Sequence, residues 1–264
     1  MQRFQDRRVV VTGAASGIGR ATTLRLLREG GAVVAADFAA DGLAETAKLA
    51  EQEGVAERLV TEHVDVSDEQ SVVDTLGRAV QRLNGLDVLV NAAGMLRATH
   101  THETTLEQWN RILAVNLTGT FLATREALPA LLEDSGGVVV NFSSTSASFA
   151  HPYMAAYAAS KGGIQSFTHT LALEYGSRGL RATCVAPGSI KSGITDATPG
   201  YLPEDTDWSL FGKLAPVLAA DGSASGVGTM GGPETVAGVV AMLASDDGAF
   251  ITGTEVRIDG GTHA

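Results

Sequence analysis

The sequence predicts an α/β protein: one doubly wound (Rossmann) domain, with a parallel seven-stranded sheet and helices on both of its faces. Two observations lead to this prediction. Short runs rich in Val and Ala alternate with longer amphipathic segments along the whole chain, an order typical of a parallel sheet built from right-handed crossovers. The short runs are also apolar almost without interruption, as expected for strands that are buried on both faces.

Each element follows from one of these runs. We expect strands over residues 9–12, 32–37, 59–64, 87–91, 138–142, 181–186 and 255–258. We expect helices over residues 17–30, 41–53, 68–83, 104–133, 154–177 and 233–244. The helix over 104–133 is expected to break near Pro129, because proline disrupts the interior of a helix.

One long segment, residues 189–232, has no regular pattern and is rich in Gly, Ser, Thr and Pro. A loop of this length within a compact domain is usually a functional lid or a disordered segment. Its apolar side chains, among them Trp208 and Phe211, favour a lid that contains a helix. We therefore predict one nucleotide-binding domain over 1–264 with a substrate-binding lid over 189–232, and a disordered insertion is the alternative.

Composition excludes several classes of protein. Lys and Arg number 19 and Asp and Glu 30, a net charge of −11, which argues against binding to nucleic acid or to an anionic membrane. The one cysteine, Cys184, cannot form an internal disulfide or a Cys-based zinc site. The histidines do not pair with carboxylates at metal-ligand spacing, so we expect no metal. No apolar run approaches the roughly 18 residues of a membrane helix, and the N-terminus lacks a secretory signal. We expect a cytoplasmic protein.

A glycine-rich turn follows the first expected strand. Gly13, Gly17 and Gly19 stand in Thr12-Gly-Ala-Ala-Ser16-Gly-Ile18-Gly. Glycines there let the backbone approach a pyrophosphate, which then lies at the N-terminus of the next helix. An ordinary strand–helix turn is the alternative.

Asp37 ends the second expected strand, 37 − 19 = 18 residues after the last of these glycines. A carboxylate at about this distance can accept hydrogen bonds from an adenosine ribose. The same charge repels a 2′-phosphate, and neither Ser16 nor Phe38 is a cation that would bind one. The sequence therefore predicts NAD rather than NADP, and the alternative for Asp37 is a cap or turn residue.

With this glycine spacing the chain resembles the short-chain dehydrogenase/reductase family, over essentially its whole length. Further motifs in the family's order are Asp65-Val66, Asn91-Ala92-Ala93-Gly94, Asn116, Asn141-Phe142-Ser143-Ser144, Tyr157-x3-Lys161, Pro187-Gly188 and Asp259-Gly260-Gly261. One departure is Ala92, where the family usually has a second Asn that helps to tie the sheet together. The resemblance implies the α/β fold predicted above, an oxidoreductase and, as a rule of this family, a homotetramer (or homodimer).

The resemblance also implies a set of site residues. It places the catalytic residues at Asn116, Ser144, Tyr157 and Lys161, and cofactor contacts at Gly13, Ser16, Gly17, Ile18, Gly19, Asp37, Asp65, Val66, Asn91, Ala92, Gly94, Tyr157, Lys161, Pro187, Gly188, Ile190 and Ser192. Asn116 would hold a water beside Lys161, or would only pack within its helix. Substrate contacts are expected from Ser144, His151, Tyr153, Tyr157 and Trp208.

The chemistry of these residues is consistent with acid–base catalysis. Tyr157 and Lys161 are four apart on an expected helix, so they share one face. A free tyrosine has a pKa near 10, and a nearby ammonium together with the positive nicotinamide would favour the phenolate. The family places its serine thirteen residues before the tyrosine, which is position 157 − 13 = 144. Ser144 would therefore donate a hydrogen bond to the substrate oxygen. Ser143 is its neighbour and is expected to face the other way.

Three functions remain open at this point. We expect an NAD-dependent oxidoreductase that interconverts a secondary alcohol and a ketone, with a small apolar or alicyclic substrate and Tyr157 as general acid/base. A 3-oxoacyl-thioester reductase is the second enzyme hypothesis, which Asp37 disfavours if such enzymes use NADPH. A non-catalytic NAD-binding sensor or scaffold is the third hypothesis.

Overall fold

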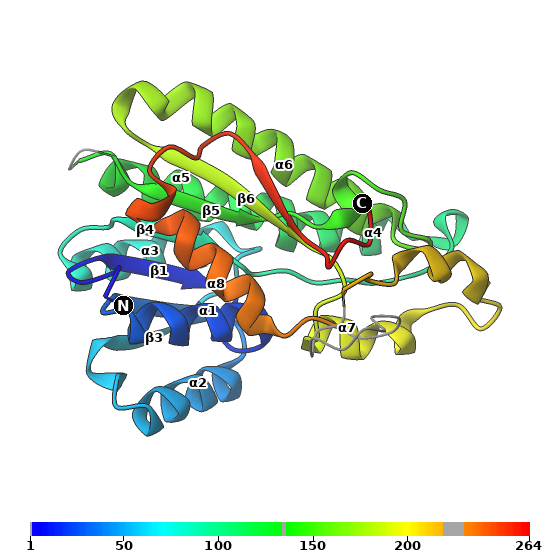
Figure 1. Ribbon diagram of the computed structural model, residues 1–264, viewed down its shortest axis with the longest axis horizontal. Helices are drawn as coiled ribbons and strands as arrows, with labels where there is room; N and C mark the ends of the chain where they lie inside the picture. The colour runs from blue at the N-terminus through cyan, green and yellow to red at the C-terminus, as the bar shows by residue number, and fades with distance from the viewer. Residues whose placement is uncertain (1, 134–135, 219–229) are drawn as a thin grey trace.

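The computed structural model of the chain describes residues 2–133, 136–218 and 230–264. The strands are β1 (Arg8–Thr12), β2 (Ala32–Asp37), β3 (Leu59–His63), β4 (Val88–Asn91), β5 (Val138–Phe142), β6 (Arg181–Pro187) and β7 (Glu255–Ile258). They form one sheet in the order β3-β2-β1-β4-β5-β6-β7, and each neighbouring pair is parallel. The predicted doubly wound, seven-stranded α/β fold is confirmed (Figure 1).

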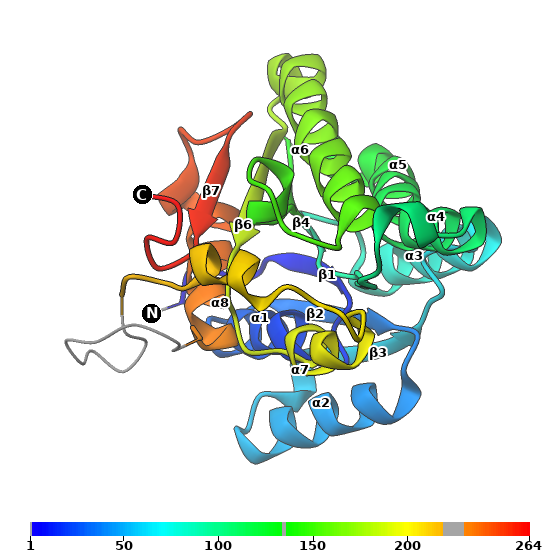
Figure 2. The same ribbon diagram turned by 90° about the vertical axis from the view of Figure 1, so that its right-hand side faces the viewer.

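Helices cover both faces of the sheet (Figure 2). The helices are α1 (Gly17–Arg28), α2 (Ala40–Gln52), α3 (Glu69–Leu83), α4 (Leu106–Leu113), α5 (Gly119–Leu131), α6 (Ala155–Tyr175), α7 (Gly193–Ala197) and α8 (Pro233–Ala244). One core layer packs α1, α2 and α8 against the sheet, and the other packs α3, α5 and α6 against its opposite face. Alternate residues of β1 enter the two layers, because successive side chains of a strand point to opposite faces.

The helix expected over 104–133 is interrupted, but not near Pro129 as expected. The chain forms α4, then a π-helical turn over Ala114–Thr118, then α5. The irregularity therefore lies around Asn116, while Pro129 sits inside α5 close to its end. Single π-helical turns occur within helices at functional sites, and Asn116 is fully buried here.

The described residues of the segment 189–232 have little regular structure. It contains α7, a helix of five residues, and two 3₁₀ helices over Thr198–Tyr201 and Trp208–Leu214. Residues 219–229 of the predicted lid lie outside the described residues. We refer to the described part, 189–218, as the lid. In the described chain no helix is both long and apolar enough to cross a membrane.

Candidate active site

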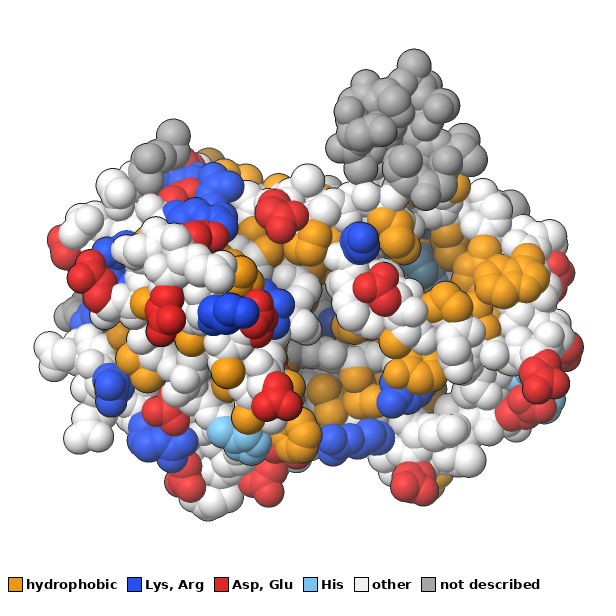
Figure 3. Space-filling model, turned by 90° about the horizontal axis from the view of Figure 1, so that it is seen from below, with side chains coloured by type: hydrophobic (Ala, Val, Ile, Leu, Met, Phe, Trp, Pro, Cys, Tyr) orange, Lys and Arg blue, Asp and Glu red, His pale blue; other side chains and the backbone are white. Residues whose placement is uncertain are grey.

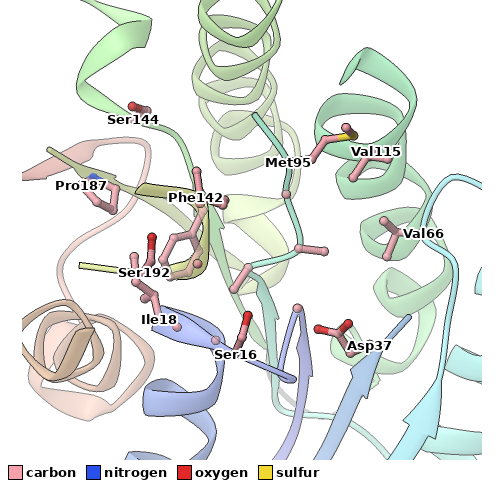
Figure 4. A pocket seen from close by; sticks show the side chains of 18 of the residues that line it. Ser16, Ile18, Asp37, Val66, Met95, Val115, Phe142, Ser144, Pro187 and Ser192 are labelled. Atoms are coloured by element: carbon pink, nitrogen blue, oxygen red, sulfur yellow. The ribbon is translucent and has the colours of Figure 1, made fainter. Parts of the chain in front are cut away.

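A cavity of about 390 Å³ opens at the carboxyl ends of the strands, within the range of small-molecule sites. It lies where the strand order reverses, between β1 and β4, which is where doubly wound sheets bind ligands. Asp37 and Val66 lie at one end of the cavity, and Ser144 and Pro187 at the other (Figure 4). Of the predicted residues, those that line it are Gly13, Ser16, Gly17, Ile18, Gly19, Asp37, Asp65, Val66, Ala92, Gly94, Ser144, Tyr157, Lys161, Pro187, Gly188, Ile190 and Ser192.

The glycine turn makes one wall of the cavity from backbone alone. A Cβ on Gly19 would lie 2.0 Å from the carbonyl oxygen of Gly13. Gly13 itself has φ +72°, and a Cβ there would lie 2.5 Å from the backbone nitrogen of Ala93. Helix α1 begins at Gly17, and Ser16 makes no side-chain cap, so unpaired N–H groups at the helix start face the cavity. These features fit a pyrophosphate.

Asp37 is held in place by two backbone groups. Its Oδ2 accepts a hydrogen bond from the N–H of Ala15 at 2.9 Å, and its Oδ1 accepts from the N–H of Ala39 at 2.9 Å. The turn role that was the alternative is therefore part of what this residue does. Each carboxylate oxygen has further acceptor capacity, and Asp37 lines the cavity, so it can also accept from a ribose.

Asp65 and Arg111 lie at the same end of the cavity. Burial raises the pKa of Asp65, but hydrogen bonds from Ser67 and the charge of Arg111 outweigh it, so that the pKa is lowered. Asp65 Oδ1 accepts from the backbone N–H and the hydroxyl of Ser67, at 2.9 and 2.6 Å. Arg111 donates from Nη1 to Ser67 Oγ at 2.8 Å and lines the cavity. This cation is a wall residue that the sequence interpretation missed.

At the other end, Tyr157 and Lys161 extend from α6 into the cavity. Lys161 is 4% exposed, and its Nζ donates to the carbonyl oxygen of Phe142 at 2.7 Å. Its Nζ lies 5.6 Å from the centroid of the Tyr157 ring. Among the described residues no carboxylate pairs with Lys161, so two of its three donors can serve a bound ribose.

The protein's own environment raises the pKa of Tyr157. Burial raises the pKa of the phenol, and a hydrogen bond with Ser144 acts against this rise. Burial also lowers the pKa of Lys161 to about 8, so the ammonium remains mostly charged at neutral pH. Desolvation thus acts on both groups, and the phenolate expected beside Lys161 and a positive nicotinamide stays a prediction.

Asn116 lies behind the wall of the cavity, where its amide is already bonded. Its Oδ1 accepts from the N–H of Met95 at 2.8 Å, while its Nδ2 donates to the carbonyl of Met95 and to Ser160 Oγ, both at 3.0 Å. Ser160 Oγ in turn donates to the carbonyl of Tyr157 at 2.7 Å. Asn116 thus connects the π-helical turn to both α6 and the segment after β4 that carries Met95. Its role as a water ligand stays a prediction.

The two neighbouring serines differ in what their hydroxyls bind. Both residues line the cavity. Ser143 Oγ is directed toward the carbonyls of Ser144 and Lys161, each at 3.4 Å. Ser144 Oγ accepts from the N–H of Ser146 at 3.2 Å, and the same side chain hydrogen-bonds with Tyr157. This difference favours Ser144 as the donor to a substrate oxygen.

Comparisons with known proteins agree with this geometry. Residues 13–263 match a family model described as enoyl-(acyl carrier protein) reductase, one of the short-chain dehydrogenase/reductase group. The chain belongs to the short-chain dehydrogenase/reductase family. It is therefore an oxidoreductase of that family, which uses a nicotinamide dinucleotide, NAD or NADP.

Relatives in this family are named for different activities. The chain is 37% identical to 3beta-hydroxysteroid dehydrogenase 1 of Eggerthella lenta, over 98% of this chain and 94% of that protein. It is 34% identical to a 3-oxoacyl-[acyl-carrier-protein] reductase of Thermotoga maritima, over 98% of both chains. Among solved structures, levodione reductase superposes with a TM-score of 0.87 at 30% identity, covering 98% of each chain.

One expected cofactor contact of the dehydrogenase does not reach the cavity. Asn91 is buried beneath it, and its Nδ2 donates to Thr124 Oγ1 at 3.0 Å and to Asn141 Oδ1 at 2.9 Å. The amide pair joins the ends of β4 and β5. It supplies a polar connection across the sheet although Ala92 lacks the amide that the family usually has there.

Three of the expected substrate residues lie outside the wall of the cavity, each in a different environment. His151 does not line the cavity: its Nε2 lies 3.2 Å from Thr145 Oγ1, and its ring stacks with His263 at 6.0 Å. Trp208 is 63% exposed in the lid. Tyr153 packs in a cluster with Tyr157 but does not line the cavity. Of these three candidates, Tyr153 alone packs in one cluster with Tyr157.

Several wall residues of the short-chain dehydrogenase cavity were missed. They are Phe38, Val64, Ala93, Met95, Arg111, Val115, Phe142, Ser143, Gly193, Ile194 and Thr195. Most are apolar neighbours of predicted residues, and a period-two argument along the strand ends could have identified Phe142. Ser160 also had a signal, because it lies three residues after Tyr157 on the same helix.

Proposed function

We propose that this protein is an NAD-dependent oxidoreductase that interconverts a secondary alcohol and a ketone on a small apolar or alicyclic substrate. The observation that supports it best is the distribution of groups in one cavity. Ser144 lies at one end and Asp37 at the other (Figure 4). Tyr157 hydrogen-bonds with Ser144, and Lys161 Nζ lies 5.6 Å from the centroid of the Tyr157 ring. The first set suits proton transfer at a carbonyl oxygen, and the second suits an adenosine ribose.

The chain's own residues can move the proton. A nicotinamide dinucleotide, when bound, supplies the hydride acceptor or donor. Ser144 Oγ donates to the substrate oxygen and stabilises the negative charge that develops there. Tyr157 Oη takes the hydroxyl proton of an alcohol or returns it to a ketone oxygen. Lys161 is buried and mostly charged at neutral pH, so it stabilises the phenolate that Tyr157 becomes on losing its proton.

The catalytic part of the proposal is tested with Tyr157→Phe. We expect kcat to fall by at least about a hundredfold, because general acid–base catalysis contributes on this scale. NADH absorbance would follow oxidation of cyclohexanol, menthol and androsterone, with Tyr175→Phe at the far end of α6 as the matched control. Retention of most of the wild-type kcat by Tyr157→Phe would contradict the assignment. No turnover of any alcohol or ketone by the wild type would favour the scaffold hypothesis.

The cofactor part of the proposal depends on Asp37. We infer NAD because a fixed carboxylate repels a 2′-phosphate, and because Phe38, 65% exposed, stands beside it rather than a cation. In Asp37→Ser the ratio of kcat/KM for NAD to that for NADP should fall by about tenfold, or about 1.4 kcal/mol. Preference of the wild type for NADP would overturn the inference.

A 3-oxoacyl-thioester reductase is the second candidate, supported by the 34% identical relative of that activity. The choice between the two can be made with acetoacetyl-coenzyme A and a cyclic ketone, each offered with NADH and NADPH. Our proposal expects faster reduction of the cyclic ketone with NADH. Faster reduction of the thioester with NADPH would favour the second candidate.

We also propose that the protein assembles as a homotetramer or homodimer. Phe121 on α5 is 42% exposed and Leu173 on α6 is 88% exposed, so these helices present apolar side chains to solvent. A second copy of the chain would cover them. Light scattering after gel filtration tests this, and a monomer at micromolar concentration would contradict it.

A further inference from the structure

We propose that Tyr153 is a positioning residue that fastens the lid over Tyr157 and thereby sets the affinity for substrate. The inference rests on the proposed function for the identity of the reacting end of the cavity. It concerns a contact that is separate from the catalytic groups: the hydroxyl and ring of Tyr153 against the lid residues Asp207 and Phe211. We call these three residues the clamp.

The backbone of Tyr153 is unusual. Its φ is +65°, and among the described residues only Asp6 and Asn84 also have a positive φ without being glycine. Asp and Asn tolerate this region through local hydrogen bonds, whereas a bulky tyrosine is a true outlier there. The conformation is fixed by a hydrogen bond from the N–H of Thr99 to the carbonyl of Tyr153 at 2.9 Å. Such strained residues concentrate at functional sites because the surrounding structure must stabilise them.

The side chain of Tyr153 is bonded to the lid. Its Oη accepts a hydrogen bond from the N–H of Asp207 at 2.9 Å. Its ring stacks on that of Phe211, with centroids 6.2 Å apart and planes 19° apart. Asp207 caps the 3₁₀ helix over Trp208–Leu214, since its Oδ1 accepts from the N–H of Ser209 at 2.9 Å. The clamp therefore holds the start of a lid helix.

The clamp lies beside the reacting end of the cavity. Leu96, Ala98 and Met154 form a small buried cluster. The residues packed against this cluster come from the segment 153–157 and from the lid. They are Tyr153, Tyr157, Ile194, Tyr201, Leu202 and Phe211. Hydrophobic side chains also gather on the lid side, at the right of the face in Figure 3. Tyr153 precedes Tyr157 by four residues, so the lid is fastened to the same short segment that carries the catalytic phenol.

Two weaker contacts accompany the clamp. The guanidinium of Arg97 lies 4.0 Å from the centroid of the Tyr201 ring. His100 Nε2 lies 2.8 Å from Asp205 Oδ1, and the ring of His100 also meets that of Tyr153 edge-on at 5.1 Å. Both contacts join the segment after β4 to the lid. Tyr153 is the residue at which the catalytic segment, the β4 segment and the lid come together.

Loss of the clamp should affect the substrate and leave the cofactor unaffected. Tyr153→Phe keeps the ring and removes the acceptor for the Asp207 N–H. We expect the KM for the alcohol substrate to rise about three- to tenfold, the scale of one hydrogen bond. The KM for NAD should stay within about twofold of the wild-type value, because the clamp does not touch the wall that faces the dinucleotide.

Hydrogen exchange gives a readout that needs no substrate. In Tyr153→Phe, peptides that span residues 201–214 should exchange faster than in the wild type, while peptides of β1 and α1 should not change. Tyr175→Phe is the matched control and should change neither. For KM, the probe is whichever of cyclohexanol, menthol and androsterone the wild type oxidises fastest.

A second variant separates positioning from folding. Tyr153→Gly accepts φ +65° without strain but loses both parts of the clamp, so the substrate KM should rise at least as much as in Tyr153→Phe, with a folded protein. Unchanged exchange over 201–214 and an unchanged substrate KM in both variants would overturn the proposal. If Tyr157→Phe retained turnover, the proposed function would fail, and the exchange result would still decide whether the clamp exists.

Discussion

The two ends of the cavity are built in different ways. At the cofactor end, the wall is backbone: glycines that leave no space for a Cβ, and strand ends fixed by the sheet. At the substrate end, the lid is held by side chains of Tyr153, Arg97 and His100 on short irregular segments. We therefore expect cofactor affinity to tolerate almost no change in local geometry. Substrate affinity should instead change by a small amount for each single contact that is lost.

The largest effect is expected from Gly19→Ala at the cofactor end. The new Cβ would lie 2.0 Å from the carbonyl oxygen of Gly13, so the turn must deform. We expect NADH affinity, measured by fluorescence titration, to fall by about a hundredfold or more, and overpacking to cost about 1–3 kcal/mol of the free energy of unfolding.

The matched control for this change is Gly77→Ala. Gly77 lies within α3, and a Cβ there meets no atom within 4 Å. This variant should keep its NADH affinity and gain about 0.5–1 kcal/mol of stability from helix propensity. If Gly19→Ala bound NADH as tightly as Gly77→Ala does, the backbone wall would not be what limits the site.

The same contrast explains what the sequence could predict. The glycine turn and the four-residue spacing of Tyr157 and Lys161 are local, so their geometry follows from one strand end or one helix. The π-helical turn at Asn116 was not predictable, because its amide partners Met95 and Ser160 come from other segments. The break expected at Pro129 rested on the rule that proline disrupts a helix. The position of the break is instead set by contacts of Asn116 with distant segments.

The lid shows the limit most clearly. The sequence predicted a substrate-binding lid over residues 189–232, but the contact from Asp207 to Tyr153 spans 54 residues and has no local pattern. The burial that raises the pKa of Tyr157 has no local pattern either, since it comes from side chains of several segments. Chemistry that depends on spacing could be predicted, and chemistry that depends on packing could not.

An intermediate effect is expected from His151, on the segment that precedes the clamp. Burial, together with the nearby His263, lowers the pKa of His151 to about 4, whereas an unfolded histidine titrates near 6.5. Between these values the unfolded chain binds a proton that the folded chain does not. The stability that neutral His151 contributes is therefore present above about pH 6.5 and is lost as the pH falls toward 4.

The measurement is urea unfolding at pH 7.5 and pH 5. Wild type should lose on the order of 2 kcal/mol more than His151→Gln over this interval, because one pKa unit corresponds to about 1.36 kcal/mol. His169→Gln, at an exposed position on α6, is the control and should behave as the wild type. An equal loss in His151→Gln and the wild type would show that His151 is not the acid-sensitive group of this segment.

The smallest effect is expected from the ion pair between His100 and Asp205. The hydrogen bond with Asp205 raises the pKa of His100, and the charge of Glu103 acts in the same direction. The ring also faces Tyr153 and lies 5.5 Å from that of His102. Below its raised pKa, His100 is charged and the pair is formed. As the pH rises through that pKa, the imidazole becomes neutral, and the lid loses the ion pair between His100 and Asp205.

The effect is small because Asp205 is exposed and salt screens exposed pairs. The substrate KM of the wild type should rise by less than about threefold between pH 6 and pH 8 relative to His100→Gln, and the difference should disappear in high salt. Using the ratio of the two proteins removes the titration of Tyr157 and Lys161, which both share. If the ratio does not change with pH, the ion pair does not hold the lid, and the clamp at Tyr153 is its main attachment. The substrate end would then depend on one strong contact, whereas the cofactor end has a continuous backbone wall.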